Sequence, residues 1–574
     1  MKNKIISLVN RYRRQNKFLD RWLKFFIKWM NVKQTGHPTW SKTLNASRAM
    51  WDSFLIESKN GSKILIGTSI GQYFAGTNLE SVLAVALTLR GADVHVLLCD
   101  SFLPACFACD VSWYPNRKTF VKYGPSKDLC KHCFAPANKL YKSLGVTVHK
   151  YGDLVTTEEQ QWADHLSTTI AVNEIAGYTF EGCSVGEHAI AGTLRFYARG
   201  TLSGEPDTEP VLRRFFKSAL LSTMAVQRLL KKVDFQAAVF HHGIYVPQGL
   251  IGEVARKENV RVVNWNPAYR KKRFIFSHQD TYHHTLMSEP VKDWEDIRWN
   301  PEVESDLLDY LKSRWEGSQD WIWFHEHPYF DLGKITEEIG VDFSKPCIGM
   351  LTNVLWDAQL HYPANAFPNM LDWVMKTIEY FEERPDLNLL IRVHPAEIRG
   401  TVPSRQTIVE EIKERFPNLP KNVFVIPPQS HISTYAAMST CDSVIIFGTK
   451  MGVELTSIGI PVIVAGEAWV RNKGITLDAS SVDGYLGLLD QLPLNKRLDE
   501  EKIKRARKYA YHFFFRRMIP LEFFEPTGRS SPYRVTVKNI SELIPGQSIG
   551  LDIICNGILN NTPFIYPAED FVSS

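Results

Sequence analysis

The stretch FGTKMGVELTSIGIPVIVAG, residues 447–466, carries the pattern on which the fold assignment rests. It predicts the end of a buried strand, a glycine-containing turn, a helix that opens at Gly452, and a second buried strand at residues 461–465. A helix start offers unbonded N–H groups and the positive end of a dipole, which together suit a phosphate. Thr449 adds a hydroxyl to the turn, and Glu454 in the first helical turn can accept hydrogen bonds from sugar hydroxyls. The alternative is that the turn only joins a strand to a helix.

Upstream, the segment LLIRVHP at residues 389–395 predicts another strand, with Arg392 and His394 at its C-terminal edge. Ligands bind at that edge in open α/β sheets. Pro395 restricts His394 to extended geometry, so the imidazole is expected at the strand end, where it can donate to phosphate beside the Arg392 guanidinium. Together with the glycine turn, this strand end predicts a nucleotide-sugar site. The alternative for His394 is a buried imidazole bonded to a backbone carbonyl.

The chain has 574 residues, which is too many for one hydrophobic core and predicts two domains plus extensions. Its 44% hydrophobic and 22% charged residues are ordinary for a globular enzyme, and a net charge of +5 is too small to indicate nucleic-acid binding. No uninterrupted apolar run approaches the roughly 20 residues of a transmembrane helix, and no signal peptide is recognisable. A cytoplasmic enzyme is therefore expected.

The N-terminal segment, residues 1–40, differs from the rest of the chain in its charge. Its first 33 residues hold ten Lys or Arg against a single acid, Asp20, with Trp and Phe between them at helical intervals. This pattern is typical of a basic amphipathic helix on an anionic surface, and it predicts peripheral contact with the inner face of the membrane. The alternative is a helix docked on the protein itself, with a solvated basic face.

Two doubly wound α/β units follow this segment. The first opens with KILIGT at residues 63–68 as a strand, but its exit loop lacks the G-x-G-x-x-G spacing, so no dinucleotide is predicted. The second begins at Pro346 and contains a predicted helix at residues 369–383. The expected fold class is α/β, with two Rossmann-like domains that face a cleft. The predicted boundaries are residues 41–330 for the N-terminal domain, 331–498 for the C-terminal domain, and 499–574 for a C-terminal helix and tail that pack back on the first domain.

The second unit resembles the capsule polysaccharide biosynthesis glycosyltransferases of the GT-B fold, including the Kdo-transferase type. The resemblance covers residues 346–490 and rests on three motifs: IRVHPAE at residues 391–397, a G-x-E-x-x-x-x-G-x-P run at residues 452–461, and VRNKGITLD at residues 470–478. It implies that His394, Glu454 and Lys473 hold the donor nucleotide. Lys450 and Met451 stand where small hydroxyl residues are expected, so Thr449 alone supplies that chemistry.

The resemblance implies transfer of a sugar from a nucleotide-sugar donor to a surface glycan, such as capsule, lipopolysaccharide or exopolysaccharide, on an acceptor that can be lipid-linked. Because the sequence has no D-x-D carboxylate pair, catalysis without an obligatory divalent metal is expected. One alternative is a nucleotide-sugar 2-epimerase of the same fold, which would act on the donor alone. Another is a non-catalytic scaffold of a polysaccharide assembly complex, which would bind no nucleotide.

Transfer requires a base for the acceptor hydroxyl, and the N-terminal domain is expected to supply it across the cleft. One candidate is Glu187, which stands beside His188 at a predicted helix start. The other is His242, in the pair His241-His242 at a predicted strand exit, where active-site residues of α/β sheets collect. The alternatives are a helix-dipole role for Glu187 and ordinary packing for the histidines. Asp357 is expected to orient the substrate.

Four cysteines form a second constellation. Two C-x2-C pairs, with twenty residues between them, have the spacing of a four-thiolate zinc site. The predicted ligands of this structural zinc are Cys106, Cys109, Cys130 and Cys133. The alternatives are an iron–sulfur cluster and unligated thiols. The other five cysteines are expected in the core.

Overall fold

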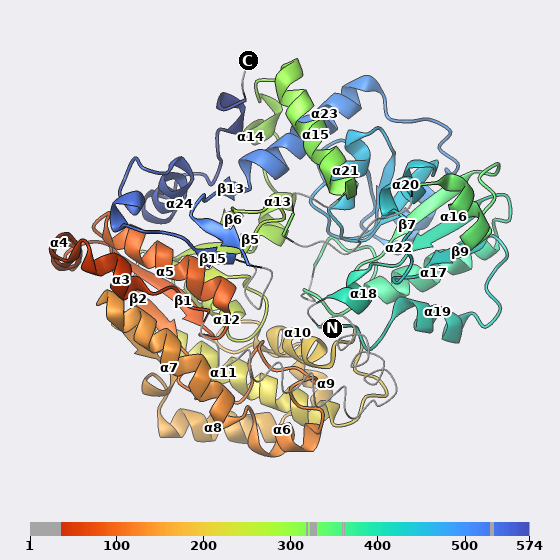
Figure 1. Ribbon diagram of the computed structural model, residues 1–574. Helices are drawn as coiled ribbons and strands as arrows, with labels where there is room; N and C mark the ends of the chain where they lie inside the picture. Colours follow the sequence, from red (N-terminus) through yellow and green to blue (C-terminus); the bar gives the residue numbers. More distant parts are fainter. Residues whose placement is uncertain are drawn as a thin grey trace, which may run out of the picture.

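The computed structural model describes residues 36–316, 320–321, 330–358, 360, 362–400, 402–527 and 533–572. The chain forms two α/β domains, each built on one central sheet (Figure 1). The basic segment predicted at residues 1–33 lies outside the described residues. Within the described ranges, no helix combines the length and the apolarity that crossing a membrane requires.

The N-terminal domain has a seven-stranded sheet in the order β13-β6-β5-β4-β1-β2-β3. Its parallel strands are β1 (Lys63–Ser69), β2 (Asp93–Leu98), β3 (Thr147–Lys150), β4 (Ala237–His241) and β5 (Arg261–Pro267). Two antiparallel strands, β6 (Arg273–His278) and β13 (Ile519–Pro520), extend the edge beside β5. Because β1 pairs with both β2 and β4, the winding reverses between β1 and β4, and a crevice opens beyond their C-terminal ends.

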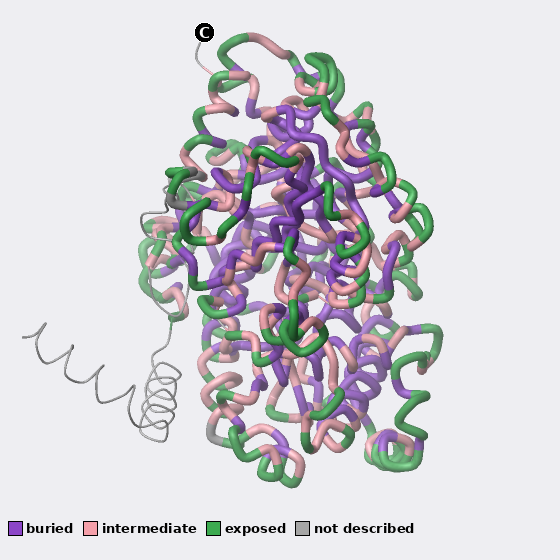
Figure 2. Tube along the Cα trace, turned by 90° about the vertical axis from the view of Figure 1, so that its right-hand side faces the viewer, coloured by how far each residue is buried: buried purple, intermediate pink, exposed green. Residues whose placement is uncertain are grey.

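Helices cover both faces of this sheet, because alternate strand residues point to opposite sides. Ile64 and Ile66 of β1 pack into one cluster with α5 (Phe74–Thr88), whereas Leu65 packs with α11 (Thr208–Lys232) and α12 (Gln248–Lys257) on the other side. All of α5 is buried, since α24 (Ile549–Asn560) and the short strand β15 (Tyr533–Val535) cover its outer side. Figure 2 shows the resulting buried interior running through the molecule.

The C-terminal domain has a six-stranded parallel sheet in the order β12-β11-β10-β7-β8-β9. Its strands are β7 (Cys347–Leu351), β8 (Asn388–Arg392), β9 (Val423–Ile426), β10 (Ser443–Ile446), β11 (Val462–Val464) and β12 (Leu477–Asp478). Here the winding reverses between β7 and β10, which creates a second crevice. The predicted α/β fold with two Rossmann-like domains is confirmed.

The connections tie the two domains together. Helix α15 (Pro301–Glu316) precedes the second sheet, and α23 (Glu500–Tyr511) follows it and continues into a π-helical turn, η2 (His512–Arg516). The chain then returns to the first sheet, because β13 pairs with β6 and α24 packs on α5 (Figure 1). The tail therefore lies against the N-terminal domain.

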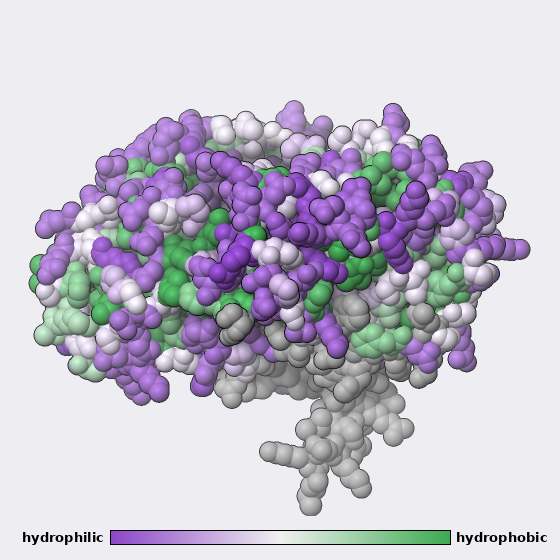
Figure 3. All heavy atoms as spheres, turned by 90° about the horizontal axis from the view of Figure 1, so that it is seen from above, coloured by the Kyte–Doolittle hydropathy of each residue, from purple (hydrophilic) through white to green (hydrophobic). Residues whose placement is uncertain are grey.

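The surface seen from above is mainly hydrophilic, and its hydrophobic areas are interrupted by polar side chains (Figure 3). The large hydrophobic side chains that are exposed come from distant parts of the sequence, for example Ile56, Trp162 and Ile398.

Candidate functional site

The first half of the candidate site lies at the end of β4, beside the crevice of the N-terminal domain. His242 follows this strand with a φ of 63°, a left-handed conformation, and its N–H donates to the Trp265 carbonyl (3.1 Å). Gly243 continues the turn with a φ of 79°. The imidazole stacks on the Tyr245 ring (centroids 5.2 Å apart), and its Nδ1 is buried without a partner among the described residues. The turn therefore presents an imidazole nitrogen that is available to a ligand.

The electrostatic surroundings keep His242 neutral. Burial, and then the charge of Arg195, lowers the pKa of His242 to about 4. Burial and the neighbouring His242 ring also hold the pKa of His241 well below its ordinary value, and Tyr73 Oη hydrogen-bonds His241 Nε2 (3.1 Å). At neutral pH, His242 can accept a proton because its ring does not already carry the charge.

A second histidine, which the sequence reasoning missed, lies beside His242. His283 belongs to α13 (Tyr282–Met287), and its ring centroid is 6.0 Å from that of His242. Its Nε2 is buried and has no partner in the described part of the chain, and burial followed by His242 lowers its pKa to about 3. The ring also lies 5.7 Å from that of Trp469 in the C-terminal domain. The histidine pair at the start of α13, directly after a tyrosine, is the only local signal for this group.

The two domains meet at this point through a polar contact. Tyr245 Oη donates to Asp357 Oδ1 (2.9 Å) and accepts the N–H of Ala358 (2.9 Å). Asp357 follows β7, so this contact joins the exit of β4 in one sheet to the exit of β7 in the other. The exits of these two strands therefore lie next to each other, with the predicted residue Asp357 at their contact.

The donor-side residues predicted at the second crevice are partly brought together. The His394 N–H donates to Thr352 Oγ1 (3.2 Å), and His394 Nδ1 accepts the N–H of Ala396 (3.0 Å). A neutral ring that accepts through Nδ1 carries its proton on Nε2, so His394 is a donor there. Across the crevice, the Asn353 amide donates to the Gly448 carbonyl. Thr449 follows directly, with Oγ1 accepting the Met451 N–H (3.4 Å).

The Glu454 carboxylate is bonded to side chains of the protein. Its side chain is 4% exposed, and its carboxylate accepts hydrogen bonds from Arg314 Nε (3.1 Å), Tyr435 Oη (2.5 Å) and Lys450 Nζ (3.4 Å). Although burial alone would raise the pKa of Glu454, Arg314 and Lys450 hold it below its ordinary value. The carboxylate therefore anchors α15 to α21 (Met451–Ser457), and its expected contact with sugar hydroxyls stays a prediction.

Arg392 and Lys473 also have structural partners. Arg392 is 1% exposed, and its guanidinium donates to the carbonyls of Pro427 (2.7 Å) and Ser430 (3.4 Å), so it orders the loop after β9. Lys473 Nζ donates to the carbonyls of Met287 and Glu289 (3.0 Å each), at the end of α13. The predicted phosphate contacts of both residues stay predictions, and Lys473 positions the helix that carries His283.

Gly452 has a packing role. A Cβ at this position would lie 2.6 Å from Ile446 Cδ1 and 2.9 Å from Val470 Cγ1, so only glycine lets the helix approach the sheet this closely. The helix begins at Met451, one residue before the predicted start. A phosphate contact at this helix start stays a prediction.

The candidate base Glu187 lies in the first turn of α10 (Val185–Tyr197) and is partly exposed. Its neighbour His188 faces the core, where Nδ1 bonds the Ile244 carbonyl (2.5 Å). The other end of α10 reaches the site, because Arg195 donates to the Phe107 carbonyl and lies 5.4 Å from the Tyr245 ring centroid. The role of Glu187 stays a prediction.

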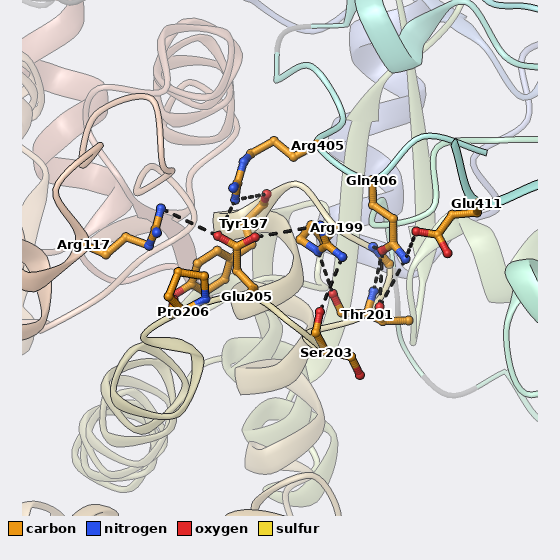
Figure 4. A network of polar contacts seen from close by, with 11 residues as sticks. Arg117, Tyr197, Arg199, Thr201, Ser203, Glu205, Pro206, Arg405, Gln406 and Glu411 are labelled. Atoms are coloured by element: carbon orange, nitrogen blue, oxygen red, sulfur yellow. Dashed lines mark hydrogen bonds and ion pairs between the residues drawn. The ribbon is translucent and has the colours of Figure 1, made fainter. Parts of the chain in front are cut away.

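A polar network beside the site joins the two domains (Figure 4). The Glu205 carboxylate is 4% exposed and is approached by three guanidinium groups, those of Arg405 (2.9 Å), Arg117 (3.6 Å) and Arg199 (3.8 Å). Next to Arg405, Gln406 Oε1 accepts the N–H groups of Gly200 (2.9 Å) and Thr201 (3.0 Å). We call this set of residues the domain latch, since Arg405 and Gln406 come from the C-terminal domain.

The four predicted zinc ligands all lie in the N-terminal domain. Cys106 Sγ is 3.9 Å from Cys109 Sγ, and Cys130 and Cys133 lie in the first turns of α7 (Lys127–Leu144). Over the described ranges, no three His, Cys, Asp or Glu side chains are already spaced to hold a metal ion. The metal stays a prediction.

Comparison with known proteins finds a family model that matches part of the second domain. Residues 350–486 match the model of the family described as capsule polysaccharide biosynthesis protein, and no curated protein matches the chain. The solved structures that it is similar to include KpsC, a β-Kdo 2,4 transferase of Thermosulfurimonas dismutans (13% identity, 54% of this chain and 87% of that chain, TM-score 0.34). Another is the UDP-GlcNAc 2-epimerase of Neisseria meningitidis, with 9% identity over 79% of this chain and 96% of that chain and a TM-score of 0.23. A third is the spinosyn rhamnosyltransferase SpnG, with 13% identity over 78% of this chain and 95% of that chain and a TM-score of 0.22. Residues 350–486 thus match the model of the capsule polysaccharide biosynthesis protein family, which confirms the resemblance found in their motifs.

Proposed function

We propose that this protein is a glycosyltransferase that moves a sugar from a nucleotide-sugar donor to a hydroxyl of a surface glycan. The observation that carries the proposal is the meeting of two sheet exits: neutral His242 after β4 lies next to Tyr245, which is bonded to Asp357 after β7. The family match of residues 350–486 supports the same activity.

In this proposal the donor phosphate lies in the second crevice, beside the Nε2–H of His394 and the hydroxyl of Thr449. The acceptor hydroxyl oxygen attacks the anomeric carbon, and its proton passes to Nδ1 of His242. The bond between the anomeric carbon and the phosphate oxygen breaks, and its electron pair leaves with the nucleotide. Asp357 orients the sugar. Phosphate charge is met by side chains and backbone N–H groups, so transfer is expected without a divalent cation.

A thermal-shift screen of the full chain against CMP, UDP, GDP and dTDP tests the donor half of the proposal. A ligand that binds only the folded state raises its stability, so one nucleotide is expected to raise the Tm. His394→Ala should remove that shift, whereas His165→Ala, on an exposed face of α8 (Thr157–Thr169), should keep it.

The outcomes separate the alternatives. A 2-epimerase would convert the donor without an acceptor, and a scaffold would show no shift with any nucleotide. Release of free nucleotide that depends on a glycan acceptor, with no added divalent cation, is the result expected of the transferase.

A further inference from the structure

The turn that holds Cys106 and Cys109 has the local geometry of a metal-binding knuckle. The N–H of Cys109 donates to the Cys106 carbonyl (2.9 Å). The two sulfur atoms are 3.9 Å apart. In a tetrahedral tetrathiolate site with bonds of about 2.3 Å, neighbouring sulfurs are about 3.8 Å apart, so this pair already spans one edge of such a site.

The second pair is presented by a helix start. Cys130 and Cys133 lie three residues apart in the first turns of α7, so their side chains project from the same face. The positive end of the helix dipole favours thiolates there, and the N–H of Gln72 donates to Cys133 Sγ (3.3 Å). Gln72 is followed by Tyr73, whose ring contacts that of Phe107 between Cys106 and Cys109 (centroids 5.5 Å apart), so both cysteine pairs lie beside the same loop.

We propose that Cys106, Cys109, Cys130 and Cys133 bind one Zn²⁺ as a closed four-thiolate site. Neutral thiols have no attraction that would draw them together, so the sulfurs of the α7 pair must rotate toward the first pair when the ion binds. Their four protons are released to solvent on binding. A closed shell leaves no position for substrate, so the role of this ion is structural.

The zinc site would stabilise a turn that contacts residues of the proposed active site. Phe107 lies between the first two ligands, and its N–H donates to the Val246 carbonyl (2.9 Å). Its ring contacts that of Tyr73 edge-on (5.5 Å), and Tyr73 bonds His241. Its carbonyl accepts from Arg195. A metal that holds this turn in place therefore also holds Tyr73, Arg195 and the Val246 carbonyl, which lie next to His242.

The test is the metal content of the full chain, purified without a metal-affinity resin. Inductively coupled plasma mass spectrometry should find about one zinc per chain. The variant Cys130→Ala/Cys133→Ala should lose it, and Cys183→Ala, a buried cysteine outside the site, should keep it. Because the double variant can fail to fold, a second measurement uses the wild type: replacing zinc with Co²⁺ should give the visible absorption of a tetrahedral thiolate site.

A folded wild-type chain that contains no zinc and gives no cobalt spectrum after Co²⁺ is added would overturn the proposal. Iron with acid-labile sulfide would overturn it in favour of a cluster. Zinc that remains in the double variant would place the ion elsewhere. None of these results depends on nucleotide binding or transfer, so the outcome is independent of the proposed function.

Discussion

His242 combines a left-handed backbone with a desolvated, neutral ring. A non-glycine residue adopts such a conformation at a cost of about 1 kcal/mol, and here the Trp265 carbonyl and the Tyr245 ring hold it in place. Burial lowers its pKa to about 4. Backbone strain together with a strongly perturbed pKa at a sheet exit is typical of catalytic groups.

The pH dependence follows from that pKa. Since the neutral ring is the base, kcat/KM should fall only as the pH drops through about 4. The unfolded chain binds the same proton near pH 6.5, so the free energy of unfolding should decrease as the pH falls from about 6.5 to about 4. Donor consumption measured across pH tests the first statement. An acidic limb at the ordinary histidine pKa would contradict the assignment.

The matched variant is His242→Asn, because asparagine tolerates the left-handed conformation but cannot act as a base. It should lower kcat by about 10²–10⁴-fold with little change in the nucleotide-induced thermal shift. His165→Ala serves as the control with unchanged kcat.

Glu454 gives a stability prediction instead of a binding prediction. Glu454→Ala removes one of the two carboxylates that pair with the buried Arg314 guanidinium, the other being that of Asp320, so the free energy of unfolding should fall by about 1.5–3 kcal/mol in urea titrations. The nucleotide-induced thermal shift should survive in a folded Glu454→Ala protein, and its disappearance would restore the donor-binding role.

These residues show why only part of the site could be predicted. The C-terminal ends of strands could be recognised in the sequence because an apolar run ends there in polar residues. This pattern indicated that His242, His394 and Asp357 lie at strand ends. The partners were not recognisable, because Arg314 is 140 positions from Glu454 and Met287 is 186 from Lys473. A buried cation or carboxylate takes whichever partner the tertiary fold brings close.

At the scale of the element, α13 depends on a residue from the other domain. The Lys473 ammonium binds the carbonyls at the end of this helix, and a hydrogen bond to a charged group contributes about 1.5–3 kcal/mol. Lys473→Met keeps the aliphatic stem but removes both bonds. It should lower the Tm and reduce kcat several-fold through His283, while the nucleotide-induced shift stays.

The control for that prediction is Lys502→Met, at an exposed position of α23, which should change neither the Tm nor kcat. A Lys473→Met protein that loses the nucleotide-induced shift but keeps its Tm would point to direct donor contact by the ammonium.

Elements with a strong local pattern were predictable. The helix expected at residues 369–383 is α17 (Met370–Glu382), and the side chain of its N-cap Asn369 accepts the N–H of Asp372. The sheet order was not predictable, because it depends on pairings such as β13 with β6, more than 200 residues apart in the chain. The π-helical turn after α23 likewise has no local sign in the sequence.

At the scale of the whole molecule, the domain latch holds the two sheets beside each other. Gln406→Ala removes the acceptor of two backbone N–H groups and leaves them unsatisfied, at a cost of about 1–3 kcal/mol each where buried. The radius of gyration from small-angle X-ray scattering should increase, and KM for the donor should rise. Gln491→Ala, on an exposed turn, is the control. Unchanged scattering would mean that the other interdomain contacts suffice.

Charge is also distributed unevenly over the molecule, and this has a consequence at a membrane surface. Ten basic residues and one acid lie in the first 33 positions, although the net charge of the chain is only +5. A basic residue near an anionic leaflet contributes about 1 kcal/mol, so the full chain should sediment with phosphatidylglycerol vesicles at low salt and not with phosphatidylcholine vesicles. At about 1 M salt the Debye length falls to about 3 Å, and binding should be lost.

The triple variant Arg21→Glu/Lys24→Glu/Lys28→Glu should bind far less, whereas Lys502→Glu/Lys504→Glu on α23 should bind as the wild type does. Equal loss in both variants would assign the attraction to overall charge and not to this segment.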